Sequence, residues 1–167
     1  MRLNPKPDLI EHLPRLRRYA RALTGDATRA DDLVQDTLER ALVKLDLWTP
    51  GSDLRAWLFT LMHNLFANQV RTRRPQDTAL DEALDIPVSG GQLEALATRD
   101  LQAALARLPD GQREVILLVG LEQFSYAEAA QVLGVPPGTI MSRLARARER
   151  MRQILADEPA VQLKVVK

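Results

Sequence analysis

Polar and basic side chains near the middle of the chain carry the chemistry needed to bind DNA. Asn64, Asn68 and Arg71 are spaced by four and three residues, so they share one face of a helix. Arg73 and Arg74 follow and extend that face. Asparagine amides can read base edges and arginines can hold phosphates, whereas asparagine is a poor helix former that needs partners in a core. The spacing therefore favours a DNA-binding face, with plain solvent exposure as the alternative.

A second candidate site lies in the segment YAEAAQVLGVPPGTIMSRLARARER, residues 126–150. Ala130, Gly134 and Ile140 fall at positions 5, 9 and 15 of a frame that begins at its first residue, which is the spacing of a helix-turn-helix. The small alanine lets two helices cross closely, the glycine permits a left-handed turn, and the isoleucine fills the gap between the helices. The pattern predicts a second helix that enters a DNA groove.

The residues of that second helix separate into two groups by face. One group is apolar with spacings of four and three, and we expect it to pack inward: Ile140, Leu144, Ala147, Met151 and Ile154. The other group suits phosphates and base edges: Thr139, Ser142, Arg143, Arg146 and Arg150. The alternative is a solvated, arginine-rich helix in a bundle.

Helices must position both groups of side chains. Aromatic residues make up only 4% of the chain, while Leu, Ala and Arg are abundant, and this composition favours helices over strands. Apolar residues spaced by three and four predict helices over 9–23, 30–45, 54–74, 93–108 and 115–119, with two more after Ser125.

Local signals predict where several of these helices begin and end. Gly25 ends the first, and Thr28 with Asp31 resembles a capping box for the second. Ser52 or Asp53 is the predicted N-cap of the third. A further capping box is predicted from a serine and a glutamate three residues apart: Ser125 and Glu128.

An acidic stretch divides the chain. Residues 75–98 carry five acidic groups and no basic ones, and the apolar periodicity lapses from Pro75 to about Gln92. The predicted fold class is therefore all-α, with two small helical domains at 8–74 and 93–156 joined by an acidic linker at 75–92.

Composition also excludes several kinds of site. The chain has no cysteine, so it has no disulfide or thiolate metal site, which fits a reducing cytoplasm. The only two histidines, His12 and His63, lack metal-ligand spacing, and no nucleophile motif or Gly-rich phosphate loop is present. We therefore predict no catalysis, no metal and no cofactor. The absence of a signal-peptide run or a long apolar run predicts no membrane insertion.

Three segments in order, ADDLVQDTLERAL, DLRAWLFTLMHN and GVPPGTIMSRLARARERM, resemble the extracytoplasmic-function (ECF) sigma factors of bacteria. The resemblance covers residues 10 to 155. It implies that 8–74 is sigma domain two and 93–156 is sigma domain four. It further implies a cytoplasmic protein that binds core RNA polymerase, recognises promoter DNA at the −10 and −35 elements, directs its melting, and is held inactive by an anti-sigma factor.

The resemblance also implies roles for individual residues. The −10 element would be contacted from a base-capture loop and the polar helix face, namely Trp48, Ser52, Asp53, Asn64, Asn68, Arg71, Arg73 and Arg74. Core polymerase would be contacted by an acidic helix face, namely Asp31, Asp32, Gln35, Asp36 and Glu39. Acidic residues in a first helical turn are also favourable without a partner. Trp57 could line the loop, but we expect it in the core.

The −35 element would be contacted by the second helix of the helix-turn-helix. Thr139 and Arg143 would hold phosphates, and Ser142 and Arg146 would reach bases. The remaining residues on this surface are Met141 and Arg150. The sequence departs from the family pattern at Met141, where relatives carry Arg or Lys, and at Ala145, which replaces a larger residue. The family pattern therefore does not predict the base preference at −35, where the loss of one Arg–guanine contact would shift discrimination by about 1–3 kcal/mol.

Three other functions compete with this interpretation. A stand-alone helix-turn-helix regulator would explain residues 110–155 but leave the Asn-rich helix without a role. A small metal-dependent nuclease or hydrolase would have to use acidic residues such as Asp31, Asp32 and Asp36. A purely helical interaction protein would need neither DNA-facing surface.

Overall fold

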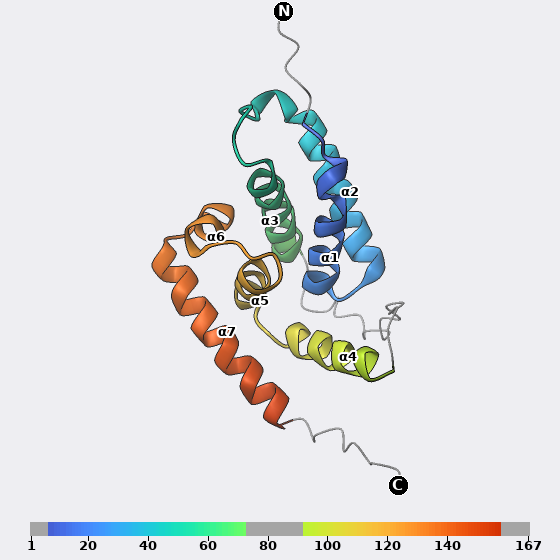
Figure 1. Cartoon of the computed structure of the whole chain (residues 1–167), viewed down its shortest axis with the longest axis vertical. Helices are drawn as coiled ribbons and strands as arrows, with labels where there is room; N and C mark the ends of the chain where they lie inside the picture. The colour runs from blue at the N-terminus through green and yellow to red at the C-terminus, as the bar shows by residue number, and fades with distance from the viewer. Residues whose placement is uncertain (1–6, 73–91, 158–167) are drawn as a thin grey trace, which may run out of the picture.

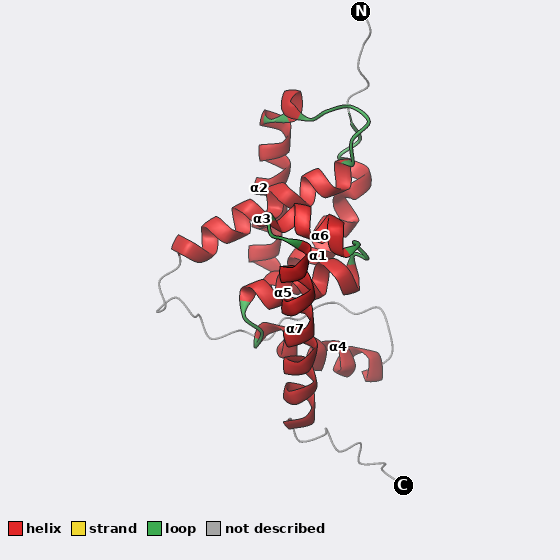
Figure 2. Cartoon of the chain, turned by 90° about the vertical axis from the view of Figure 1, so that its left-hand side faces the viewer, coloured by secondary structure: helices red, strands yellow, loops and turns green. Residues whose placement is uncertain are grey.

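The structure is a computed structural model that describes residues 7–72 and 92–157, without the side chains of 92–98. Both described ranges consist of helices and connecting loops, with no strand in either, which confirms the predicted all-α class (Figures 1 and 2). The first range forms the N-terminal unit: η1 (Ile10–His12), α1 (Leu13–Thr24), α2 (Ala27–Val43), η2 (Leu45–Leu47) and α3 (Leu54–Thr72). The second forms the C-terminal unit: α4 (Gln92–Ala106), α5 (Asp110–Ile116), the π-helical turn η3 (Leu117–Leu121), α6 (Tyr126–Leu133) and α7 (Pro137–Asp157).

The turn between α1 and α2 corrects one prediction. Gly25 ends α1 in the left-handed conformation with φ 69°, as its position predicts. The N-cap of α2, however, is Asp26, whose Oδ1 accepts a hydrogen bond of 3.1 Å from the main-chain N–H of Arg29. The predicted capping box of Thr28 and Asp31 is therefore wrong, because the extended backbone at Asp26 starts the helix two residues earlier.

The other caps follow the sequence signals. Asp53 Oδ1 accepts from the N–H of Ala56 at 3.2 Å and so caps the start of α3. Ser125 and Glu128 form a capping box at the start of α6, with both reciprocal hydrogen bonds present. Gly134 then turns the chain into α7 with φ 66°. The predicted end of α3 near Arg74 lies outside the described residues.

The helix-turn-helix is present as predicted. Ala130 on α6 and Ile140 on α7 are both buried, and the two helices pack against each other. The predicted inward face of α7 is buried along its whole length, at Ile140, Leu144, Ala147, Met151 and Ile154.

The two units share one hydrophobic core, and α3 lies against α6 in both ribbon views (Figures 1 and 2). The ring of Phe59 on α3 stacks edge-on against Tyr19 at 5.1 Å and against Phe124 of the C-terminal unit at 5.2 Å. Met62 and Phe66 are buried on α3 as well. Helix α3 therefore buries a second apolar face beyond the leucine stripe that the sequence indicates.

Candidate nucleic-acid and polymerase interface

The polar face of α3 lies in solvent. Asn64, Asn68 and Arg71 are all exposed. Arg71 Nη2 donates a hydrogen bond of 3.2 Å to Asn68 Oδ1, which leaves the amide nitrogen of Asn68 available to a ligand. The face thus carries one amide held by a guanidinium group and a second amide four residues earlier. Two further predicted residues, Arg73 and Arg74, lie outside the described residues.

Two polar side chains of the predicted base-capture loop make hydrogen bonds within the chain. Asp53 caps α3, as described above, and Ser52 Oγ donates 2.6 Å to the carbonyl of Thr49. Trp48 is half-buried, and its indole N–H is buried without a hydrogen-bond partner. Trp57 is half-buried and packs on the core, which is the place expected for it.

Helix α2 has one buried and one polar face. Leu33, Val34 and Thr37 are buried, and Thr37 satisfies its hydroxyl by donating 2.7 Å to the carbonyl of Leu33. The five residues predicted to face polymerase are all exposed: Asp31, Asp32, Gln35, Asp36 and Glu39. The buried face fixes the orientation of the helix, so its acidic face points into solvent.

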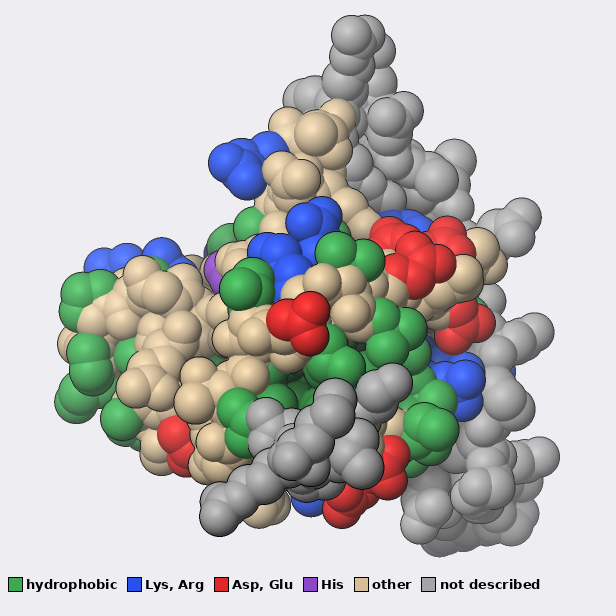
Figure 3. All heavy atoms as spheres, turned by 90° about the horizontal axis from the view of Figure 1, so that it is seen from above, with side chains coloured by type: hydrophobic (Ala, Val, Ile, Leu, Met, Phe, Trp, Pro, Cys, Tyr) green, Lys and Arg blue, Asp and Glu red, His purple; other side chains and the backbone are tan. Residues whose placement is uncertain are grey.

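Exposed aliphatic side chains continue from the end of α2. Leu42 is 62% exposed, Val43 is 81% exposed and Leu47 is 76% exposed. Figure 3 looks onto the end of the molecule where α2 leads towards α3, and it shows hydrophobic side chains at the surface and a group of acidic side chains to one side.

Helix α7 presents its predicted DNA-facing residues in two ways. Ser142, Arg146 and Arg150 are exposed, as is Met141 at 56%. Thr139 and Arg143 are half-buried. The guanidinium group of Arg143 lies over Gly111, where an added Cβ would come within 3.6 Å of Nη1. Helix α5 therefore supports Arg143, while Arg146 is free to reach outward.

Polar contacts between the two units were not predicted from the sequence. His63 Nδ1 lies 2.9 Å from Glu114 Oε1, and Arg18 Nη2 lies 3.1 Å from Glu122 Oε1. Arg55 donates 3.2 Å to the carbonyl of Glu122 and lies 4.1 Å from the centre of the Phe124 ring. The partners are 51 to 104 residues apart in the chain, so no local spacing could have indicated them.

These contacts place charge next to buried groups. Burial is the largest cause that raises the pKa of Tyr19 well above its ordinary value, and the carboxylates of Glu114 and Glu122 raise it further. Burial lowers the pKa of Arg113, an effect opposed by Asp110 and Glu114. The phenol of Tyr19 therefore stays neutral at the centre of the contact between the units.

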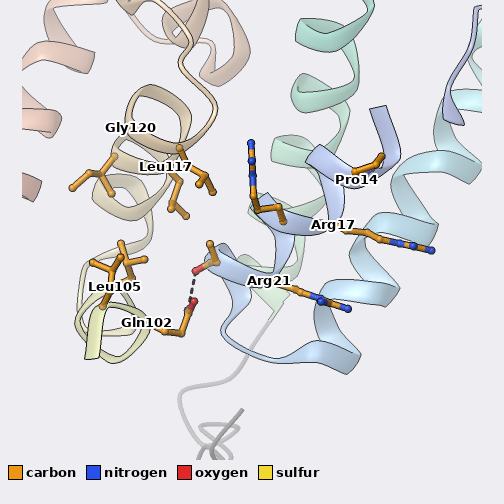
Figure 4. A pocket seen from close by; sticks show the side chains of 12 residues that line it. Pro14, Arg17, Arg21, Gln102, Leu105, Leu117 and Gly120 are labelled. Atoms are coloured by element: carbon orange, nitrogen blue, oxygen red, sulfur yellow. Dashed lines mark hydrogen bonds between the residues drawn. The ribbon is translucent and has the colours of Figure 1, made fainter. Parts of the chain in front are cut away.

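A groove of about 730 Å³ runs between the units, lined by α1 on one side and by α4, α5 and η3 on the other (Figure 4). Its floor is apolar, with Leu105 and Leu117 among the lining residues, and Gln102 bridges it by donating 3.1 Å to the carbonyl of Ala22. Three arginines of α1 belong to its lining, but the side chains of Arg17 and Arg21 extend away from α4 and η3 (Figure 4), and Arg18 is paired with Glu122. The groove is therefore mainly apolar.

Two structural features bear on competing functions. Among the described residues, none of the helices is long and apolar enough to cross a membrane. The same residues contain no group of three or more His, Cys, Asp or Glu side chains arranged to hold a metal ion. Asp31, Asp32 and Asp36 in particular lie along an exposed helix face and do not converge.

Comparisons with known proteins match both units. Residues 9–63 match the family model "Sigma2 domain of PhyR", and residues 98–151 match "Sigma-70, region 4". The chain is 44% identical over 152 residues to the ECF RNA polymerase sigma factor EcfG of Rhodopseudomonas palustris, covering 90% of this chain and 84% of that one.

Solved structures give the same result. The chain is similar to the sigma factor RpoE in its complex with the anti-sigma factor NepR from Bartonella quintana, with 40% identity, a TM-score of 0.77, and coverage of 90% of this chain and 96% of that one. It is also similar to CnrH in complex with the cytosolic domain of CnrY, with 30% identity, a TM-score of 0.69, and coverage of 90% and 86%.

Proposed function

This chain belongs to the ECF RNA polymerase sigma factors, and on that premise we propose which of its surfaces perform each step. As a sigma factor it binds core RNA polymerase and directs promoter recognition for transcription initiation. The observation that carries the assignment is that three exposed polar faces lie on helices α2, α3 and α7, whose opposite faces are buried. We take residues 8–74 as sigma domain two, 75–92 as the linker and 93–156 as sigma domain four, bounds supported by the matched ranges 9–63 and 98–151.

The exposed face of α3 is the proposed −10 contact. Asn64 and Asn68 would read base edges, and Arg71 would hold phosphate, with Arg73 and Arg74 extending the contact. The loop before α3 would receive an extruded base through Trp48, Ser52 and Asp53. Asp53 already caps α3, so it would act through its second carboxylate oxygen or by supporting the loop.

The exposed face of α7 is the proposed −35 contact. Arg146 and Ser142 are free to reach bases, while Arg143, which is supported by α5, and Thr139 would hold phosphates. Met141 and Arg150 complete this surface. An exposed apolar side chain at Met141 can contact the methyl group of thymine but cannot hydrogen-bond guanine, which makes the base preference different from that of an arginine.

The acidic face of α2 is the proposed contact with core polymerase. Its carboxylates suit a basic partner, and their exposure in the free chain means that they need not be uncovered first. Asp31, Asp32, Gln35, Asp36 and Glu39 form this surface.

An anti-sigma factor is the proposed regulator, since RpoE is seen in complex with the anti-sigma factor NepR and CnrH in complex with the cytosolic domain of CnrY. The groove between the units offers an apolar floor, which would suit the apolar face of an amphipathic helix. Both units line the groove, so a partner bound there would stabilise the arrangement in which the units are packed together.

The chain is proposed to act in the cytoplasm, where RNA polymerase works, and to contribute no catalytic step of its own. Nothing in the comparisons supports the alternative of a stand-alone helix-turn-helix regulator. Matches at both ends of the chain instead favour a protein that uses both units together.

Transcription in vitro tests the assignment. Purified chain and bacterial core polymerase are combined on a fragmented genomic template, and RNA start sites are sequenced. Discrete starts that share two upstream elements are expected, and in an N64A/N68A variant the shared −10 sequence should become less strict. Tight DNA binding by the chain alone without initiation would contradict the proposal.

A further inference from the structure

Two buried carboxylates of the C-terminal unit are paired with basic side chains of the N-terminal unit. The side chain of Glu122 is fully buried, and its Oε1 is bound by Arg18 at 3.1 Å while its Oε2 has no partner. The side chain of Glu114 is 6% exposed and is bound by His63 at 2.9 Å. A buried carboxylate without a partner is strongly unfavourable, so each basic side chain stabilises its glutamate at the contact between the units.

The packed arrangement is too short to reach both promoter elements as proposed above. Helix α3 packs directly against α6, and three residues separate the end of α6 from the start of α7. The helix lengths place the α3 face and the start of α7 no more than about 60 Å apart. Elements centred about 25 base pairs apart, as their names −35 and −10 state, are separated by roughly 85 Å of B-form DNA. The units must therefore separate before both elements are bound.

We propose that the pairs Arg18–Glu122 and His63–Glu114 form an autoinhibitory latch, which keeps the free chain closed and opposes formation of a polymerase complex that contacts both promoter elements. This inference rests on the proposed function for the need to open, but the latch itself is defined by contacts within the chain. When the units separate, both glutamates become solvated. The free-energy cost of opening therefore depends on how strongly each basic side chain stabilises its carboxylate in the closed form.

Two substitutions made in sequence distinguish a latch from ordinary packing. The first removes a basic side chain, and the second removes the carboxylate charge that is left without a partner. In R18M the carboxylate of Glu122 is left buried without a partner, and the closed form is destabilised. In R18M/E122Q no charge is stranded, so closure returns. Arg18 is about half exposed, so R18M should leave the fold of α1 intact. The matched control is R17M, which removes the same charge from the exposed neighbouring position.

The primary readout is the distance between the units in the full-length chain. The absence of native cysteine allows two spin labels at T28C on α2 and Q131C on α6, both exposed positions, for pulsed electron resonance. We expect one short distance for wild type and R17M, an open-to-closed ratio raised by about tenfold in R18M, and a return to the short distance in R18M/E122Q. A second pair of variants, H63L and H63L/E114Q, should show the same loss and recovery.

The second readout is the apparent affinity for core polymerase in the presence of a promoter fragment that carries both elements, because that complex requires separated units. A mostly closed chain binds with its affinity reduced by the open fraction, so R18M should bind up to about tenfold tighter and R18M/E122Q should return to wild type. An unchanged distance in R18M, an open R18M/E122Q, or an opened R18M with no gain in affinity would each overturn the latch. The distance measurement contains no DNA or polymerase, so failure of the DNA-contact assignments would leave its result intact.

Discussion

The guanidinium group of Arg113 on α5 donates a hydrogen bond of 3.0 Å to the main-chain carbonyl of Leu23 at the end of α1. The same group donates to three carbonyls that close α4, those of Leu105, Ala106 and Leu108. One side chain thus satisfies helix-end carbonyls in both units, as expected for a rigid, planar set of five donors.

Replacement of Arg113 by methionine should therefore destabilise the whole chain. We expect the free energy of unfolding to fall by about 2–4 kcal/mol, because three partly buried carbonyls and one exposed carbonyl lose their donors at once. R113K should recover only part of this loss, since an ammonium group cannot reach all four acceptors. Urea unfolding followed by circular dichroism measures the change. R148M, at an exposed position of α7, is the control, and equal stability of R113M and R148M would refute the prediction.

Alanine at Asn64 and Asn68 should weaken recognition of the −10 element without affecting stability. Both side chains are exposed, so the melting temperature should stay within about 1–2 °C. Each lost base contact should reduce discrimination by about 1–3 kcal/mol. Initiation rates on templates that vary only at −10 measure this effect, with Q131A as the surface control. Wild-type preference in N64A/N68A would exclude these residues from base reading.

Arginine substitutions on α7 should separate base reading from phosphate binding. R146A should reduce discrimination between bases at one −35 position by about 1–3 kcal/mol. R143A should weaken binding to all sequences alike and lower the slope of log affinity against log salt concentration by about 1. Binding of the polymerase–sigma complex to a −35 promoter library at several salt concentrations measures both. The opposite pattern would exchange the two roles.

Charge reversal on α2 should weaken assembly with core polymerase. D32R/D36R should lower the affinity by tenfold or more at low salt, with a smaller difference at high salt, because exposed charges are screened. Fluorescence anisotropy of labelled chain titrated with core enzyme measures it, and D157R at the end of α7 is the charge-matched control for the single reversal D32R. If D157R weakened binding equally, net charge rather than the α2 face would be responsible.

High pH should unfold the chain through Tyr19. Its pKa is raised by burial first and by Glu114 and Glu122 second, so the folded chain favours the protonated phenol. The associated stability is fully present below the ordinary tyrosine pKa of about 10 and is lost as pH rises above it towards the raised pKa. In Y126F, which leaves Tyr19 as the single tyrosine, ionisation at 295 nm should coincide with loss of helical signal. Y19F should lose less stability over the same pH range, and ionisation of Tyr19 in a still-folded chain would contradict the assignment.

Local sequence patterns were sufficient for the helices and for the helix-turn-helix. The inward face of α7 and the capping box of Ser125 and Glu128 depend on residues within one or two turns of each other, so their spacing predicts them directly. The start of α2 was missed because two acceptable N-cap signals lie close together, and the backbone at Asp26 decides between them.

The sequence by itself determined the all-α class, the apolar stripes, and the polar faces of α2, α3 and α7, because each follows from the 3.6-residue period of a helix. The tertiary structure alone decided that α3 has a second buried face, and that His63 meets Glu114 and Arg18 meets Glu122. Those pairings join residues far apart in the chain, and no periodic pattern predicts which carboxylate will be buried beside which basic side chain. The packing of the two units determines the pairs, because a carboxylate can be buried there only where a basic side chain lies close enough to bind it.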